Sequence, residues 1–296
     1  MKTKNINHLF LDDVMNGKCV DYYYHLGTSS DDPILSKFKN IKSVIMCGSG
    51  GRIKELASKW SKLNKDAEII ALPKEDRFVT RYCADVLFAS HGMGMPSASI
   101  AIQELMRLTY FLKDGNLDEL DKIFWCRVGT SGGVGVEGGD VIVTTESLMG
   151  DLKPYRLING GFGEYWFGGE FPPSVISDII NSTNNAKFNV VAGKTIGAND
   201  FFLEQFRLDG AVCMETSDSK MNWLTWIHEN GVKNIEMEGP MIAGYLNHWG
   251  FSKFAMICCS IVNRLNGDQI TSTPEELKSF DSNAATVLFN YLIKHI

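Results

Sequence analysis

The chain has 296 residues, of which 44% are hydrophobic and 22% are charged, and its formal net charge is −6. This size and composition are typical of a globular protein with one large domain or two small ones. The acidic balance argues against a nucleic-acid surface, and no run approaches the ~18 uninterrupted apolar residues that indicate a membrane span.

Cysteine usage and the first residues predict the compartment. The seven cysteines are scattered without CxxC spacing, which suits reduced thiols better than disulfides or a zinc site. Residues 1–7 are polar, carry lysine and are not followed by a long apolar core, so we expect no signal peptide. These features predict a cytoplasmic protein without a nucleic-acid or membrane partner.

Short apolar runs rich in strand-forming residues alternate with helical patterns, which predicts an α/β fold around a mostly buried sheet. In chain order, the expected strands are residues 43–47, 68–72, 86–90, 123–128, 141–144, 189–192, 234–237 and 254–262. The expected helices are residues 51–63, 97–112, 173–181, 220–230, 239–248 and 274–293. Residues 148–170 are rich in glycine and aromatic residues and are expected to be irregular loop.

A glycine-rich turn follows the first predicted strand. Gly48-Ser49-Gly50-Gly51 leads into a predicted helix, and Arg52 comes directly after the glycines. Backbone N–H groups at a helix start bind anions, and an adjacent guanidinium would lie beside the same anion. The pattern is neither GxGxxG nor Walker A, so a tight connection without a ligand explains it equally well.

The next strand-to-helix turn, residues 90–97, favours a structural interpretation. We expect Ser97 to cap the following helix and His91 to be a hydrogen-bonded turn residue. Arg77 lies in a charged segment before a strand, and its local sequence is that of a surface arginine.

A cation, a hydroxyl group and flexible backbone follow one another at the end of strand 123–128. The segment reads Arg127-Val128-Gly129-Thr130-Ser131-Gly132-Gly133. A guanidinium binds phosphate oxygens in a two-pronged fork, and glycines let main-chain N–H groups approach an anion closely. This segment therefore suits a phosphate.

Gln205 and Arg207 lie two residues apart in the segment 201–207. Alternate residues of an extended chain face the same side, so these two could address one flat polar ligand. The alternative is a solvated loop, which the local sequence alone favours.

Two carboxylates flank Met237 in Asn234-Ile235-Glu236-Met237-Glu238. Carboxylates are good acceptors for sugar hydroxyls, although acids also occur at helix N-termini because the helix dipole favours them there. Combined with the segment 127–133, these residues indicate an enzyme that handles a ribose beside a phosphate.

Together these segments resemble the nucleoside phosphorylase-I family, and within it the branch that acts on uridine. The resemblance runs from His25 to the C-terminal helix, and its most specific parts are residues 90–94, 127–133, 234–238 and 263–270. It implies a single-domain α/β fold, with a central twisted mixed β-sheet or distorted barrel surrounded by helices. That domain would span residues 21–296, after an N-terminal extension of residues 1–20.

The resemblance also implies roles for residues, position by position. Phosphate would be bound by Gly48, Arg52, Arg127 and Thr130, and by Arg77 from a neighbouring subunit. Ribose would be bound by Thr130, Glu236, Met237 and Glu238, and by the neighbour's counterpart of His25. Uracil would be bound by Gln205 and Arg207, between walls formed by Phe201, Ser131, Gly132, Ile261 and Val262. The catalytic residues would be Arg127, Gln205, Arg207 and Glu238.

The implied activity is the reversible phosphorolysis of uridine to uracil and ribose 1-phosphate, with deoxyuridine and thymidine as further candidate substrates. Phosphate would be the co-substrate, and no metal or organic cofactor is expected. Because two residues would serve a neighbour's site, we expect a homo-oligomer, with a dimer favoured over a hexamer.

Two departures from the family pattern leave alternatives open. Glu204 and Phe206 flank Gln205 where the family often has small residues, and Phe78 stands where some relatives have a glutamate for a potassium ion. The alternatives are a purine nucleoside phosphorylase, a nucleosidase that uses water, and a non-catalytic nucleoside-binding protein. Against the purine enzyme, Val262-Asn263 stands where that branch carries Ser-Asp. Against the nucleosidase stand three arginines suited to phosphate.

Overall fold

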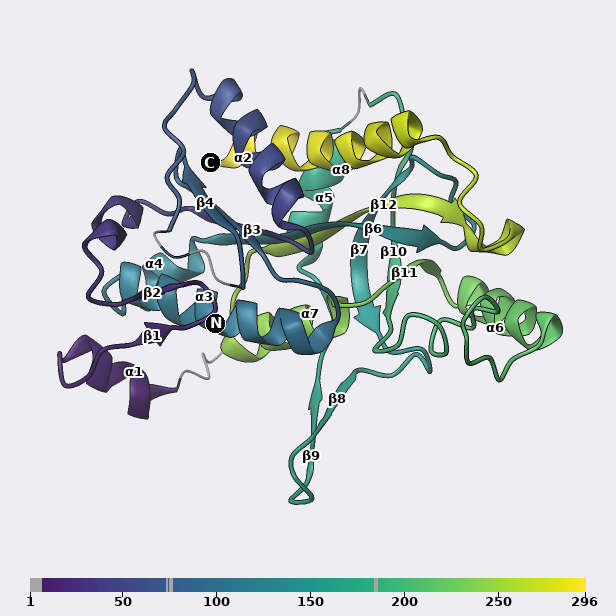
Figure 1. Cartoon of the computed structure of the whole chain (residues 1–296), viewed down its shortest axis with the longest axis horizontal. Coiled ribbons are helices and arrows are strands. Elements are labelled where there is room, and N and C mark those ends of the chain that lie inside the picture. Colours follow the sequence, from purple (N-terminus) through teal and green to yellow (C-terminus); the bar gives the residue numbers. More distant parts are fainter. Residues whose placement is uncertain (1–6, 73, 75–76, 184–185) are drawn as a thin grey trace. The chain divides into compact units, whose positions relative to one another are not determined.

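The computed structural model describes residues 7–72, 74, 77–183 and 186–296 (Figure 1). The chain divides into two compact units. The first extends to Arg127 and includes residues 249–254 and 296, and the second contains residues 128–248 and 255–295.

The first unit is built on a sheet with the strand order β6-β3-β5-β4. Strand β3 (Ser43–Cys47) pairs in parallel with β5 (Val86–Ser90) and with the start of β6 (Phe124–Gly133). Strand β4 (Thr80–Cys83) adds an antiparallel edge to β5. Every residue of β3 and β5 is buried, as expected for continuous apolar runs in a sheet covered on both faces.

Helices cover this sheet. Helix α2 (Gly50–Leu63) packs against β3, β4 and β5 through a buried face that includes Ile53, Leu56 and Trp60. The other helical segments are α1 (His8–Met15), η1 (Pro33–Phe38), α3 (Met95–Leu112) and α4 (Leu117–Asp121). Two short antiparallel strands, β1 (Tyr22–Tyr23) and β2 (Thr28–Ser29), enclose the loop that carries His25.

The second unit contains a closed five-stranded barrel. Strand β10 (Val190–Gly197) lies in parallel between β11 (Val232–Glu236) and β7 (Val141–Leu148). Strand β7 pairs antiparallel with β12 (Phe254–Asn263), which neighbours β6. The end of β6 pairs antiparallel with β11, and this pairing closes the ring.

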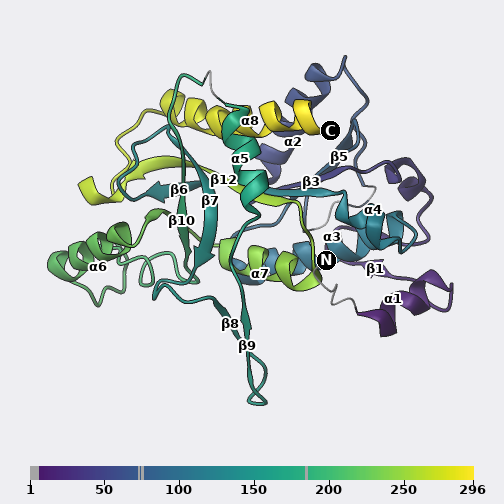
Figure 2. The same cartoon turned by 180° about the vertical axis from the view of Figure 1, so that it is seen from behind.

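Helices and one hairpin surround the barrel. Helices α5 (Pro173–Asn181) and α8 (Pro274–His295) lie together beside β7 (Figure 2). Helix α6 (Ser217–Glu229) packs on β11 and on the short turn η2 (Arg264–Asn266), and α7 (Gly239–Trp249) follows β11. The hairpin of β8 (Tyr155–Ile158) and β9 (Glu164–Phe167) projects from this unit in both views.

The α/β architecture with a distorted barrel is confirmed. The predicted strands 43–47 and 86–90 and the predicted helix 173–181 have the observed bounds. The remaining predicted helices are found with ends shifted by a few residues. Several predicted strands are longer in the structure, because strands that close a barrel continue past the apolar run that signals them.

The predicted strand 68–72 is wrong. Only Ile70 pairs there, in an isolated bridge to Tyr82 of the edge strand β4. Glu68 and Ile69 are exposed, so this segment lacks the buried face that would hold a full strand on the sheet.

The prediction of irregular loop for residues 148–170 is also wrong. Strands β8 and β9 pair over four positions, from Tyr155↔Phe167 to Ile158↔Glu164. The connecting residues begin with Asn159-Gly160, a dipeptide that favours tight turns between strands. The high glycine content therefore marks a hairpin turn.

Candidate functional site

In the first unit, two strand-to-helix turns lie side by side at the carboxyl ends of β3 and β5. A Cβ added to Gly48 would lie 2.9 Å from the carbonyl oxygen of Gly92, and the N–H of His91 donates to the carbonyl of Cys47 at 2.9 Å. The carboxyl ends of parallel strands are where open α/β sheets bind ligands. Gly48 therefore stands at a suitable place for an anion.

The predicted cap role of Ser97 is wrong. Helix α3 begins earlier, at Met95, after Gly94, and the Ser97 hydroxyl donates to the carbonyl of His91 at 2.7 Å. Ser97 thus stabilises the turn of residues 90–97 by holding its backbone. His91 is buried in this turn, and it is hydrogen-bonded there through its backbone N–H and carbonyl.

The two arginines that this chain is predicted to supply to its own phosphate site lie on elements next to β3. Arg52 is in the first turn of α2, directly after the glycines, and is half-buried. Arg127 is buried in β6 and pairs in register with Met46 of β3. Arg52 thus lies in the helix that begins at the β3 turn, and Arg127 lies on the neighbouring strand, beside the end of β3.

The residues that were predicted to serve a neighbouring subunit also lie near each other in the first unit. The N–H of Phe78 donates to the carbonyl of His25 at 3.1 Å, and the two rings are 6.1 Å apart. Arg77, which precedes Phe78, is exposed. The His25 ring shares a hydrogen bond with Glu104, with Nδ1 2.7 Å from Oε1.

In the second unit, the pairing of β6 with β11 brings two predicted segments together. Gly132 pairs with Ile235 and Gly133 with Asn234, so Thr130 and Ser131 precede the point where β6 meets the ribose segment. Only glycine fits at position 133, because a Cβ there would lie 2.3 Å from the backbone carbonyl oxygen of Val136.

A buried chain of polar side chains fixes this junction. Asn234 Nδ2 donates to the Ser131 hydroxyl at 2.9 Å, and Asn234 Oδ1 accepts from the Thr195 hydroxyl at 2.6 Å. Thr195 also shares a hydrogen bond with Thr144 at 2.8 Å. Because each of these polar groups has a partner, the network specifies one arrangement of the barrel.

Glu236 accepts backbone hydrogen bonds at the start of helix α7. Its two carboxylate oxygens accept from the N–H groups of Glu238 and Gly239, each at 2.8 Å. The sequence left open whether this acid binds sugar or lies at a helix N-terminus, and these two hydrogen bonds are typical of an acid at a helix N-terminus. Met237 is half-buried and Glu238 is buried beside it.

The predicted base-binding residues lie on a loop between β10 and α6. Gln205 is 5% exposed, and its backbone carbonyl accepts from Arg264 Nη2 at 2.7 Å. The Arg207 guanidinium carbon lies 4.7 Å from the centre of the Phe201 ring, and its Nε donates to Asp209 at 2.9 Å. The hydrogen bond from Arg207 lowers the pKa of Asp209, which keeps this carboxylate charged.

Sequence analysis missed a buried ionic network behind Gln205. Arg264, which is 1% exposed, donates through Nε to Asp268, and Lys220 Nζ lies 2.6 Å from the other Asp268 oxygen. Burial lowers the pKa of the Arg264 guanidinium, and Asp268 opposes that shift. The available signal was the arginine and aspartate four residues apart within the segment 263–270.

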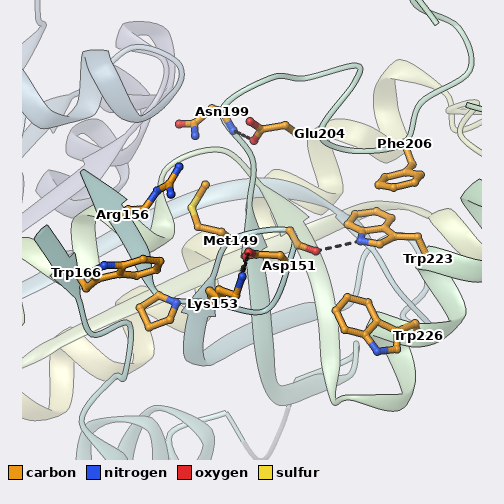
Figure 3. A pocket seen from close by; sticks show the side chains of 12 residues that line it. Met149, Asp151, Lys153, Arg156, Trp166, Asn199, Glu204, Phe206, Trp223 and Trp226 are labelled. Atoms are coloured by element: carbon orange, nitrogen blue, oxygen red, sulfur yellow. Dashed lines mark hydrogen bonds and ion pairs between the residues drawn. The ribbon is translucent and has the colours of Figure 1, made fainter. Parts of the chain in front are cut away.

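The two unusual neighbours of Gln205 belong to a different cavity. Phe206 has a left-handed φ of 53°, and its ring stacks on Trp223 with centroids 4.6 Å apart and planes 11° apart. Glu204 accepts from the N–H of Asn199 at 2.6 Å. Both line a cavity of about 660 Å³ (Figure 3), together with Met149, Gly150, Asp151, Lys153, Pro154, Arg156, Trp166, Asn199, Trp223 and Trp226.

The lining of this cavity bears on whether Glu204 and Phe206 belong to the predicted base site. Of the described residues that line it, none is a predicted uracil contact. The ring of Phe206 and the carboxylate of Glu204 thus line a cavity that contains none of the predicted uracil contacts.

The last two predicted wall residues, Ile261 and Val262, lie near the end of β12 and are half-buried.

Among the described residues, no group of three or more His, Cys, Asp or Glu side chains is placed to hold a metal ion. Within the same part of the chain, no helix is both long and apolar enough to cross a membrane.

Comparison with known proteins gives consistent results. The family model described as "Phosphorylase superfamily" matches residues 42–296. "Uridine phosphorylase A" of Schistosoma mansoni is 34% identical, over 92% of this chain and 91% of that protein. "Inactive uridine phosphorylase B" of the same organism is 31% identical, over the same shares of both chains. The crystal structure of uridine phosphorylase from Schistosoma mansoni in complex with thymidine superposes with a TM-score of 0.88 at 30% identity, covering 98% of this chain and 97% of that one.

Proposed function

The chain belongs to the phosphorylase superfamily, and we propose that it is a uridine phosphorylase. Inorganic phosphate would attack the anomeric carbon of uridine and release uracil and ribose 1-phosphate, in a reversible transfer of a pentosyl group. The main structural support is that strand β6 connects the predicted phosphate and ribose segments. One strand runs from Arg127 through Thr130 to Gly132 and pairs there with the segment that leads to Glu238.

The base would be read by Gln205 and Arg207. Negative charge grows on the uracil as the glycosidic bond breaks, and donors fixed in advance stabilise that charge best. Asp209 and Phe201 hold the guanidinium in place before substrate binds, and Arg264 holds the Gln205 backbone. Walls from Ser131, Gly132, Phe201, Ile261 and Val262 would complete the uracil site.

The attacking phosphate would be bound by Gly48, Arg52, Arg127 and Thr130 and by the partner's counterpart of Arg77. Guanidinium forks match the geometry of phosphate oxygens and would both aim the nucleophile and balance its charge. A nucleosidase that uses water would need no such set of cations.

Ribose recognition would fall to Met237 and Glu238, with Thr130 and the partner's counterpart of His25. A carboxylate accepts from sugar hydroxyls and so fixes the ring at the angle that the attack requires. Glu236 would act here chiefly by orienting Met237 and Glu238, because its oxygens already accept from the backbone of that turn.

No metal or organic cofactor is part of this proposal, since phosphate is the nucleophile and the protein's own donors stabilise the leaving base. The enzyme would be a cytoplasmic homodimer with shared sites, with a hexamer as the alternative assembly. Residues 21–296 would form the catalytic domain and residues 1–20 an extension.

A panel of nucleosides tests the proposal. The protein is incubated with uridine, thymidine, inosine or adenosine, with and without phosphate, and the release of free base is followed. We expect uracil from uridine only when phosphate is present. Release of base from inosine would support a purine enzyme, and release without phosphate a nucleosidase.

The second candidate function is nucleoside binding without turnover. The observation in its favour is the 31% identity to a relative described as inactive. Calorimetry separates the two, because a non-catalytic binder would bind uridine and phosphate yet release no uracil in the panel. The buried, anchored Gln205 and the paired Arg207 support the catalytic function.

A further inference from the structure

Glu104 is a buried acid in the middle of helix α3 that the reaction above does not use. It is 5% exposed. Within the described residues, its carboxylate forms hydrogen bonds with two consecutive residues, His25 and Leu26. The backbone N–H of His25 lies 3.2 and 3.1 Å from its two oxygens, and that of Leu26 lies 3.0 Å from Oε2. The fourth contact is the one between His25 Nδ1 and Oε1, at 2.7 Å.

These contacts decide where the proton of the imidazole lies. An ionised carboxylate only accepts hydrogen bonds, so the close contact requires Nδ1 to carry the proton. The other ring nitrogen, Nε2, is then the one that can address a further group, as the second nitrogen of a held histidine does. The side chain of His25 is 38% exposed, so part of the ring is accessible to a ligand.

The same arrangement extends to Arg77. The carbonyl of His25 accepts from the N–H of Phe78, whose side chain is 2% exposed and fixes the position of this backbone. Backbones of the two segments touch, because a Cβ on Gly27 would overlap the carbonyl oxygen of Lys74. We refer to His25, Gly27, Arg77 and Phe78 as the donated patch.

Attachment of this segment to α3 has a separate cause. Arg107, one helical turn after Glu104, pairs with the buried Asp21 at 2.9 Å. It also donates to the carbonyl of Tyr22 at 3.5 Å. Arg107 therefore secures the chain before the loop, whereas the Glu104 carboxylate binds His25 and Leu26 within the loop.

We propose that Glu104 is a positioning residue that fixes His25, with its proton on Nδ1, and thereby orders the donated patch that one subunit presents to its partner's nucleoside site. This inference rests on the proposed function, in which His25 and Arg77 act in the neighbouring subunit. It adds a residue that touches no substrate and acts through the groups it holds.

Kinetics of three variants separate positioning from simple anchoring. Glu104→Ala removes the carboxylate's hydrogen bonds to His25 and Leu26 and should lower kcat/KM for uridine on the order of 10²-fold, the cost of misplacing a substrate-positioning group. Glu104→Gln keeps one oxygen for the backbone but places an amide N–H opposite Nδ1, and should raise the KM for uridine more than it lowers kcat. Arg107→Ala is the matched control, and should lower the melting temperature while leaving the KM for uridine within about twofold of wild type.

Nitrogen-15 spectra of the histidine side chains give a readout that does not depend on turnover. The His25 imidazole should carry its proton on Nδ1 in the wild type and on Nε2 in Glu104→Gln. The same tautomer in both proteins would overturn the proposal.

Mixed dimers test directly whether Glu104 acts in the partner's site. One subunit carries Glu104→Ala and the other Arg207→Ala, and the two are purified together through different tags. The site with an intact base loop then receives His25 from a subunit whose Glu104 is intact, so activity should return to on the order of half that of wild type. Activity no higher than the mean of the two parent variants would overturn the proposal. A wild type that releases no uracil would overturn the proposed function instead, and the tautomer measurement would still judge the role of Glu104.

Discussion

At the scale of single residues, the proposed base site depends on how Arg207 is held. Its guanidinium has a carboxylate partner, Asp209, and an aromatic neighbour, Phe201, before any substrate arrives. Such pre-orientation reduces the rearrangement needed when charge develops on the leaving base. Asp209, two positions after Arg207, was not recognised from the sequence, because a loop aspartate has many equivalent explanations.

We expect Arg207→Ala to lower kcat/KM for uridine on the order of 10²- to 10³-fold, because it removes a donor at the place where charge grows. The melting temperature should change little, since a single charge pair near the surface contributes modestly to stability. Steady-state kinetics and thermal unfolding measure both. Arg156→Ala, on the exposed hairpin, serves as the control, and an unchanged kcat/KM in Arg207→Ala would remove this residue from the base site.

At the scale of elements, the loop between β10 and α6 is held from both sides. Arg264 binds the Gln205 carbonyl on one side, and the stack of Phe206 on Trp223 secures the other (Figure 3). Phe206 adopts a left-handed backbone, which costs a residue with a Cβ roughly 1–2 kcal/mol. The packing of its ring offsets that cost.

At position 206, glycine should give a more stable protein than alanine, the reverse of the usual order of stability. Phe206→Ala loses the stack and keeps the left-handed strain, whereas Phe206→Gly loses the stack and relieves the strain. We therefore expect the glycine variant to be more stable than the alanine variant by about 1 kcal/mol, measured by urea unfolding. Trp226→Phe, which lines the same cavity, is the control. An alanine variant more stable than the glycine variant would show that the left-handed backbone is not retained.

The buried ionic network should be essential for stability. Asp268→Ala leaves both Arg264 and Lys220 without their shared carboxylate, and breaking a buried pair in this way costs about 3–5 kcal/mol. Denaturant titration measures the loss. The KM for uridine should rise as well, since Arg264 also holds the Gln205 carbonyl. A loss below 1 kcal/mol would mean that these charges are solvated in the folded protein.

Comparison of particular elements shows what the sequence could predict. Buried strands such as 43–47 were found because continuous apolar runs are a strong signal, and the family resemblance supplied the proposed site residues. The orientation of the Phe206 side chain was not predictable. It depends on a left-handed backbone, and the sign of φ at a non-glycine residue is set by tertiary packing. The β8–β9 hairpin was missed because its glycine-rich turn was interpreted as loop, and the Glu104 contacts join residues 79 positions apart.

At the scale of the whole molecule, sites shared between subunits require an oligomer. His25 and Arg77 lie in adjoining segments of the first unit and would complete a partner's site. Sedimentation of the purified protein should therefore show a dimer or a higher assembly under assay conditions. Fully active monomers would contradict the shared sites.

The central claim is that phosphate itself becomes attached to the sugar. Phosphorus-31 NMR of a reaction with uridine and inorganic phosphate measures this directly, alongside the uracil released. We predict a sugar-phosphate signal that grows in equal amount with uracil while inorganic phosphate declines. Uracil accompanied by free ribose and a constant phosphate signal, or no change in any signal, would contradict the account.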